Sequence, residues 1–119
     1  MGFTYARIKI RKGYGSKKSV EQRLLVDSGA IYTVVPTEDL NELGIIAHSE
    51  EEFELADGNI IKRKVGDAHY EFKGRKASAP VVFGEKGDSK LLGALTLEAL
   101  GFVLDPLRRE LRPLRKRLA

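Results

Sequence analysis

The residues best placed to do chemistry lie at the end of an apolar run, in the sequence LLVDSGA over positions 24–30. Asp27 follows three apolar residues and precedes Ser28 and Gly29, which are typical of turns. Because the mostly apolar residues 31–35 come next, this turn joins two core strands and must lie near the interior. A carboxylate there is costly unless it is hydrogen-bonded or paired. The backbone N–H groups of Ser28 and Gly29 can bind it, so the stretch predicts a carboxylate held rigidly at the floor of a cleft.

Few other side chains in the sequence could carry out chemistry. The chain has no cysteine, which excludes disulfides, thiolate metal sites and cysteine nucleophiles. Its two histidines, His48 and His69, lack the spacing of a metal-binding pair, and we expect both at the surface or at a strand edge. The aspartates Asp39, Asp67 and Asp88 lie in polar segments, where we expect them on the surface. We therefore predict no metal and no other cofactor.

Alternating apolar and polar residues predict strands over most of the chain. The pattern is clearest over 4–11, 20–26, 65–72, 77–83 and 102–104, and weaker strand-like segments cover 31–35, 45–55 and 109–112. Many short strands with only two isolated helices favour an all-β fold, a small closed or sandwiched barrel. The 119 residues suffice for one domain, which we place at 1–119 with a basic tail over about 107–119.

Each of the two expected helices has a clear stop signal. Residues 37–43 form the first, with Thr37 as the N-cap, acidic residues in the first turn and Gly44 at the C-terminal end. Residues 95–100 form the second, which ends at Gly101.

Residues Ala56, Asp57, Gly58 and Asn59 are the strongest hairpin signal in the sequence. Asp-Gly suits the positive φ angles of a tight type I′ turn, so we expect the strand before it to fold back at this point. A second loop, over 12–18, is rich in glycine and lysine but lacks the spacing of a phosphate-binding P-loop. We expect that loop to be a plain hairpin connection.

The net charge of +4 is concentrated near the end of the chain, where residues 108–117 contain six basic residues and one acid. Such a tail can touch nucleic acid, but a solvated end with Leu111 and Leu114 packed inward explains it as well. Nucleic acid is therefore an unlikely partner, and a nucleic-acid-associated protein remains the third candidate function. No apolar run reaches the roughly 18 residues of a membrane span, and the N-terminal residues lack the order of a signal peptide, so we expect a cytoplasmic protein with no membrane partner.

Three motifs in order resemble the aspartic proteases of the retroviral, or retropepsin-like, type. The stretch 24–30 is similar to their active-site signature, two apolar residues followed by Asp-Ser/Thr-Gly-Ala/Ser. Residues 91–93, Leu-Leu-Gly before a short helix, resemble the second landmark, and the 56–59 hairpin lies between the two, where the family has its flap. The ending GFVLDP over 101–106 looks like that of the small cellular forms in bacteria and archaea. The resemblance covers about residues 20–106.

The resemblance implies a closed acid-protease barrel with one flap hairpin and one or two short helices, present as a homodimer. It implies an aspartic endopeptidase in which Asp27 is catalytic and Ser28 and Gly29 support the active-site turn. The hydroxyl of Ser28 would bind the partner turn across a two-fold axis. Ala30 and the tip residues 56–59 would contact an extended peptide or an unfolded protein as substrate.

A single Asp-Ser-Gly turn requires a second chain for this chemistry. One ionised carboxylate takes a proton from water while a second, protonated one polarises the scissile carbonyl, and two carboxyls about 3 Å apart share one proton. Neither Asp57 nor Asp105 lies in such a turn, so the second carboxylate must be the Asp27 of another copy. An isologous dimer brings the two together on its two-fold axis.

The sequence departs from the retroviral pattern beside the active-site turn. Retroviral enzymes usually have acidic residues just after the signature and an arginine after the late glycine, and these positions are Ile31, Tyr32 and Ala94 here. The missing ion pair predicts a more apolar substrate subsite. A fold relative that binds peptides, or assembles with other chains, without cleaving them remains the alternative function.

Overall fold

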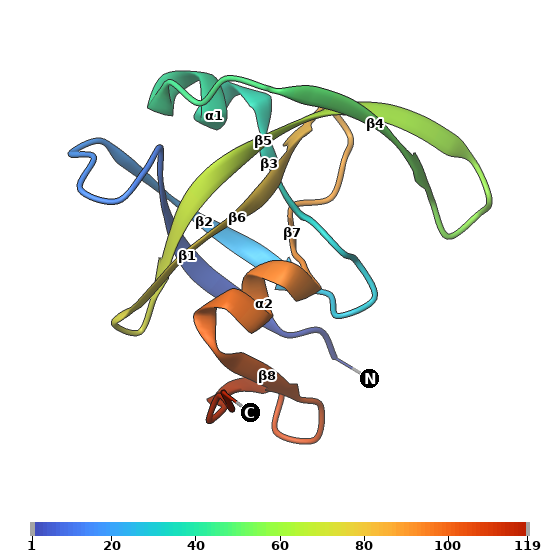
Figure 1. The fold of residues 1–119 in the computed structure, drawn as a ribbon. Helices are drawn as coiled ribbons and strands as arrows, with labels where there is room; N and C mark the ends of the chain where they lie inside the picture. The colour runs from blue at the N-terminus through green and yellow to red at the C-terminus, as the bar shows by residue number, and fades with distance from the viewer. Residues whose placement is uncertain (1, 119) are drawn as a thin grey trace.

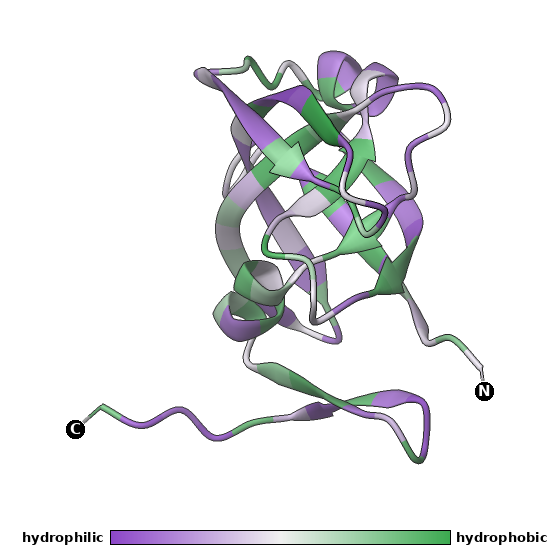
Figure 2. Cartoon of the chain, turned by 90° about the vertical axis from the view of Figure 1, so that its right-hand side faces the viewer, coloured by the Kyte–Doolittle hydropathy of each residue, from purple (hydrophilic) through white to green (hydrophobic). Residues whose placement is uncertain are grey.

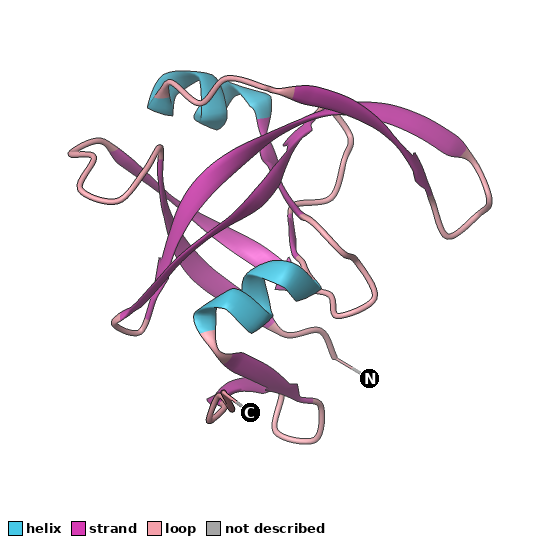
Figure 3. Cartoon of the chain, viewed as in Figure 1, coloured by secondary structure: helices cyan, strands magenta, loops and turns pink. Residues whose placement is uncertain are grey.

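The computed structural model describes residues 2–118, and about half of these residues lie in β-strands (Figure 3). The elements in chain order are β1 Tyr5–Arg11, β2 Ser19–Val26, β3 Thr33–Pro36, α1 Thr37–Leu43, β4 Ser49–Glu54, β5 Ile60–Phe72, β6 Arg75–Gly84, β7 Leu91–Leu92, α2 Ala94–Leu100, β8 Phe102–Asp105 and β9 Glu110–Pro113. The predicted all-β class with two short helices is confirmed, and the strand expected over 65–72 begins earlier, at Ile60.

The main sheet closes on itself as a barrel (Figure 1). Its strand order is β1-β2-β7-β3-β6-β5-β4, and β1 also pairs with β5, so every strand of this sheet except β4 belongs to a closed ring. The strand β4 pairs only with β5 and extends from the barrel as one arm of a hairpin. Closure removes free edges from the strands of the ring, at which they would otherwise pair with other chains, whereas β4 keeps an unpaired edge.

The interior of the barrel is filled by the inward-facing residues of the alternating strands. Ile8, Ile10, Leu24, Val35 and Tyr70 are completely buried, while their neighbours along each strand are more exposed. Burying a large apolar side chain contributes about 1.5–3 kcal/mol, so this set accounts for much of the stability of the fold.

The helices lie where the sequence predicts them, although one capping prediction is wrong. Residue 36, a proline, occupies the N-cap position of α1, and no side chain caps that helix. The hydroxyl of Thr37 instead donates a hydrogen bond of 2.8 Å to the carbonyl of Gly84, on β6. Both expected stops are confirmed, since Gly44 and Gly101 adopt the left-handed conformation.

The C-terminal segment forms a separate two-stranded sheet of β8 and β9 below the barrel, and the chain then extends away from it to one side (Figure 2). Leu111 is buried as expected, but Leu114 is half exposed, so only the first of the two leucines packs inward. Lys116 donates to the carbonyl of Ala99, and the N–H of Leu114 donates to that of Gly101. These bonds attach part of the tail to the end of α2.

His69 is not at the surface, which corrects the sequence-based expectation. Its side chain is 4% exposed because the β1–β2 loop folds over it, with the ring of Tyr14 in edge contact at 5.8 Å. Neither ring nitrogen has a hydrogen-bond partner among the described residues. His48 is exposed, as expected.

Within residues 2–118, no helix is long and apolar enough to cross a membrane. The same residues contain no group of three or more His, Asp or Glu side chains placed to hold a metal ion.

Candidate active site

Asp27 lies directly after β2, where the strand leaves the barrel wall and turns. Its N–H donates to the carbonyl of Leu92 at 3.1 Å, which continues the ladder between β2 and β7 beyond the last strand residue. One carboxylate oxygen, Oδ1, accepts a hydrogen bond of 2.9 Å from the N–H of Gly29, and the Asp27 carbonyl accepts one from Ala30. Asp27 is half-buried, whereas Ser28 and Gly29 are exposed. The turn therefore fixes the carboxylate and presents it at the surface of the monomer.

The second sequence landmark, residues 91–93, lies against this turn. β7 pairs in parallel with the end of β2, and the start of α2 binds the loop that follows Asp27. The N–H of Ala94 donates to the carbonyl of Ala30 at 2.8 Å, and that of Leu95 donates to the carbonyl of Ile31 at 3.1 Å. Main-chain bonds on both sides of Gly93 thus hold the loop.

A buried threonine pair supports the same junction from inside the barrel. Thr33 Oγ1 accepts a hydrogen bond of 3.0 Å from the N–H of Gly93 and lies 2.7 Å from Thr96 Oγ1. Both threonines are completely buried. Gly93 was identified from the sequence, but Thr33 and Thr96 were not. A hydroxyl residue inside an otherwise apolar strand or helix was the pattern that could have indicated these two threonines.

Gly93 also allows two backbone segments to come unusually close. A Cβ atom at this position would lie 2.5 Å from the carbonyl carbon and oxygen of Tyr32 and 2.8 Å from the carbonyl oxygen of Ile31. Only glycine fits such a distance, because the contacting atoms are backbone atoms that cannot swing away.

A cavity of about 550 Å³ lies between this loop and the β4–β5 hairpin. Its lining residues from the loop after Asp27, named the candidate active-site loop, are Gly29, Ala30, Ile31 and Tyr32. Those from β4 and the residue after it are Glu51, Glu52, Phe53, Glu54 and Leu55. The structure therefore brings Ala30 into the cleft. The predicted contact residues 56–59 are exposed at the hairpin tip and do not line the cavity, although the tip extends on the same side of the barrel as the active-site loop (Figure 1).

The turn at the hairpin tip differs from the expected type. Asp57 does not have a positive φ angle, and only Gly58 does, at 88°. Leu55 and Asn59 are joined by a backbone bond across a three-residue loop, and the N–H of Gly58 donates to the carbonyl of Leu55. This is the pattern of a type I turn followed by a glycine bulge, so the type I′ prediction is wrong. The Asp57 carboxylate accepts from the N–H and side-chain amide of Asn59, which stiffens the tip.

An aromatic and acidic wall connects the hairpin to the active-site loop. The rings of Tyr32 and Phe53 meet edge to face at 5.8 Å, and the Tyr32 hydroxyl donates a long hydrogen bond of 3.4 Å to Glu51. Burial raises the pKa of Tyr32, and the neighbouring Glu51 carboxylate raises it further, so the hydroxyl keeps its proton. Tyr32 is one of the positions at which retroviral enzymes usually have a charged residue and at which the sequence predicts a more apolar substrate subsite.

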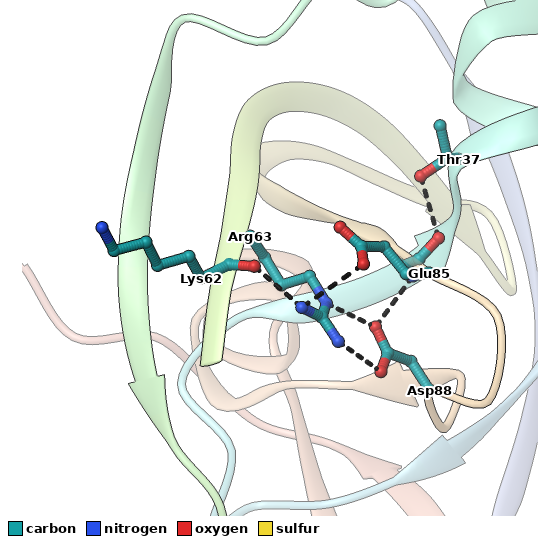
Figure 4. A network of polar contacts seen from close by, with 6 residues as sticks. Thr37, Lys62, Arg63, Glu85 and Asp88 are labelled. Atoms are coloured by element: carbon teal, nitrogen blue, oxygen red, sulfur yellow. Dashed lines mark hydrogen bonds and ion pairs between the residues drawn. The ribbon is translucent and has the colours of Figure 1, made fainter. Parts of the chain in front are cut away.

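An ion-pair network around Arg63 forms part of the lining of the cleft (Figure 4). Its guanidinium donates to both carboxylate oxygens of Asp88, at 2.7 and 2.9 Å, and lies 3.5 Å from Glu85. The hydrogen bond from Arg63 lowers the pKa of Asp88, although burial opposes it. Asp88 is thus a half-buried partner that holds the loop after β6, and the expectation of a free surface carboxylate is wrong.

A larger cavity, of about 1070 Å³, lies between α1 and the loop over 84–90. No residue of the Asp27 turn lines it. The smaller cavity adjoins the turn, since Gly29 and Ala30 line it, although Asp27 and Ser28 themselves do not.

No family model matches the sequence, and no curated protein is significantly similar to it. Among solved structures, the solution structure of the simian foamy virus (mac) protease matches with a TM-score of 0.55 and 21% identity, over 80% of this chain and 92% of that one. The chain has the retropepsin-like fold. A retropepsin-like aspartic protease from Rickettsia conorii is similar as well, with a TM-score of 0.48 and 24% identity over 88% of this chain and 86% of that one. In this retropepsin-like chain, Asp27 lies directly after the core strand β2, and the β4–β5 hairpin lines the cleft beside it.

Proposed function

We propose that the chain is a homodimeric aspartic endopeptidase in which Asp27 of each copy supplies one of two catalytic carboxylates. The observation that carries the proposal is the Asp27 turn itself, on a retropepsin-like fold. The carboxylate is oriented by the Gly29 N–H, lies next to a cleft and stands at the surface, where a second copy can reach it.

Hydrolysis follows from two such carboxylates placed side by side. Because two carboxyls about 3 Å apart share one proton, one is a base and the other an acid at the same pH. The base takes a proton from a water molecule, which attacks the scissile carbonyl while the acid donates to its oxygen. The tetrahedral diol then collapses, the C–N bond breaks, and the leaving amine takes a proton. No cofactor takes part in these steps.

The dimer is supported by exposed apolar side chains around the turn. Phe3, Ile31 and Leu95 are 73%, 65% and 38% exposed. Backbone hydrogen bonds join Ile31 to Leu95 in the loop after Asp27, and Thr4, the chain neighbour of Phe3, to Val26 just before Asp27. An exposed apolar patch is typical of a surface that binds a partner, and self-pairing of this patch brings the two turns together.

The substrate would be an extended peptide lying between the active-site loop and the β4–β5 hairpin. Peptides bind in this way by main-chain hydrogen bonds, with side chains alternating into pockets. In this proposal Ala30 contacts the peptide from below, and the tip residues 56–59 close over it and exclude water.

Peptide cleavage tests the function. Purified wild-type protein and Asp27→Asn are incubated with a mixture of extended peptides across acidic and neutral pH, and the products are identified by mass spectrometry. The proposal expects cleavage by the wild type alone. Equal turnover by both proteins would assign the hydrolysis to another group or to a contaminant. Binding of peptides without any cleavage would favour the non-catalytic peptide-binding module.

A mixing experiment tests whether the site is shared. An equal amount of Asp27→Asn, refolded together with the wild type, should reduce the activity of a fixed amount of wild type to about half, because random pairing places half of its subunits in mixed dimers. Ser28→Ala is not a suitable partner for this mixing experiment, because Ser28 belongs to the same turn as Asp27. Unchanged activity after exchange, or a strictly monomeric active protein in sedimentation, would contradict the shared mechanism.

A further inference from the structure

One carboxylate of the cleft has no use in the proposed catalytic mechanism. Glu51 is half-buried and lines the cavity, whereas its neighbour Glu50 on the same strand is exposed and does not line it. Glu51 and Phe53 are the two half-buried residues of β4, as expected for residues two apart on the same face of a strand.

The cross-strand partner of Glu51 does not neutralise it. Arg63 lies directly opposite on β5, and paired opposite charges in such positions usually attract. The guanidinium of Arg63 turns instead to Asp88, which it binds through two nitrogen atoms. Among residues 2–118, no Lys, Arg or His forms an ion pair with Glu51, and its polar contact is the long bond from Tyr32.

The charge that lines the cleft is therefore negative. Arg63 and Asp88 cancel, and the remaining charged side chains of the lining are Glu51, Glu52 and Glu54. Glu51 is the most enclosed of these three and stands beside the rings of Tyr32 and Phe53. An aromatic surface with a carboxylate at its edge fits a long cationic side chain, whose methylene groups pack on the rings while its charge meets the carboxylate.

Resting on the proposed function, we propose that Glu51 is a specificity-determining residue that selects peptides with a lysine or arginine near the scissile bond. The apolar lining, which includes Val34, Val82 and Leu91, would receive the neighbouring uncharged side chains. A peptide with an acidic residue in the same place is disfavoured, because it would bring two like charges together in a partly enclosed site.

Matched peptides test the assignment. Three sets of fluorogenic peptides differ only in having lysine, norleucine or glutamate at each position flanking one cleavage site, and kcat/KM is measured for the wild type, Glu51→Gln and the control Glu50→Gln. The wild type should prefer lysine over norleucine by roughly three- to tenfold at the responsive position, the range of a partly exposed ion pair. Glu51→Gln should lose this preference, mainly through KM, and Glu50→Gln should keep it.

The outcomes separate this inference from the proposed function. Cleavage of the norleucine peptides with no lysine preference in the wild type, or a preference that survives Glu51→Gln, overturns the role of Glu51 and leaves the peptidase standing. If no peptide is cut, the peptidase fails, and anisotropy of the labelled peptides on Asp27→Asn and on Asp27→Asn/Glu51→Gln still decides the role of Glu51. Tighter binding of the lysine peptide that depends on Glu51 supports it, and equal binding of all three peptides refutes it. Thermal unfolding of each variant confirms that it is folded.

Discussion

Replacing Gly93 by alanine should damage both the fold and the site, because a single methyl group has no room. The backbone at Gly93 is extended, with φ −89° and ψ 172°, and alanine adopts this conformation without strain. The effect of the substitution is therefore purely steric. The new Cβ would lie 2.5 Å from two backbone atoms of Tyr32.

The size of the effect follows from these distances. Carbon atoms pack favourably at about 3.5–4.0 Å, so the two segments must separate by about 1 Å. Overpacking of this kind costs about 1–3 kcal/mol. The separation also stretches the hydrogen bonds from Ala94 to Ala30 and from Leu95 to Ile31, each contributing about 0.5–1.5 kcal/mol. We expect a loss of about 3 kcal/mol in the free energy of unfolding, together with a displaced Asp27 turn.

Urea unfolding and peptide cleavage measure the two consequences of Gly93→Ala. The control is Gly13→Ala, since Gly13 has no positive φ angle and its nearest atom to an added Cβ is the hydroxyl of Ser16 at 3.8 Å. The control should unfold within about 0.5 kcal/mol of the wild type. A Gly93→Ala protein with wild-type stability would refute the reasoning that the loop and the start of α2 are locked at this contact.

Two further substitutions should change stability in defined ways. Thr33→Val should lower the free energy of unfolding by about 2–4 kcal/mol, because the Gly93 N–H and the Thr96 hydroxyl lose a buried partner; Thr33→Ser keeps the hydroxyl and should lose less in urea titrations. Asp88→Asn should destabilise by about 1 kcal/mol at pH 7, a value reduced for partial exposure. Because Arg63 holds the folded pKa of Asp88 below its ordinary value of 3.8, this contribution is present above that pH and is lost as the pH falls through the folded value, so the variant and wild type should converge in acid. A difference that persists at low pH would exclude the ion pair as its cause.

Much of the fold could be predicted because its signals are local. Alternation identified β1, β2, β6 and most of β5, but not the two-residue strand β7, and Gly44 and Gly101 ended the helices at the expected residues. The Asp27 turn could be identified because a carboxylate between two apolar runs is costly to bury unless it is paired or hydrogen-bonded. Its contact with residues 91–93, which lie far along the chain, was suggested only by the family resemblance.

The features that the sequence did not predict depend on distant partners. Threonine is a residue type that favours the N-cap position, but the Thr37 hydroxyl donates to the carbonyl of Gly84, 47 residues away. His69 occupies an outward position on β5, and only the folding of the β1–β2 loop over it makes it buried. Asp88 lies in a polar loop in the sequence, which predicts a surface position, but Arg63 on β5 binds its carboxylate in the structure. In each case the deciding contact is tertiary and leaves no local pattern.

The precision of the Asp27 position arises from strand register rather than from the turn alone. Leu24 and Val26 face the core, and a shift of one residue in β2 would turn both outward, so the buried faces fix where the strand ends. The pairing of Val26 with Leu92 and the bond from the Asp27 N–H to the Leu92 carbonyl carry that register into the first turn residue. The carboxylate is therefore already oriented in the single chain. Pairing of two copies would then need no reordering of the turn, which lowers the entropic cost of assembling a shared site.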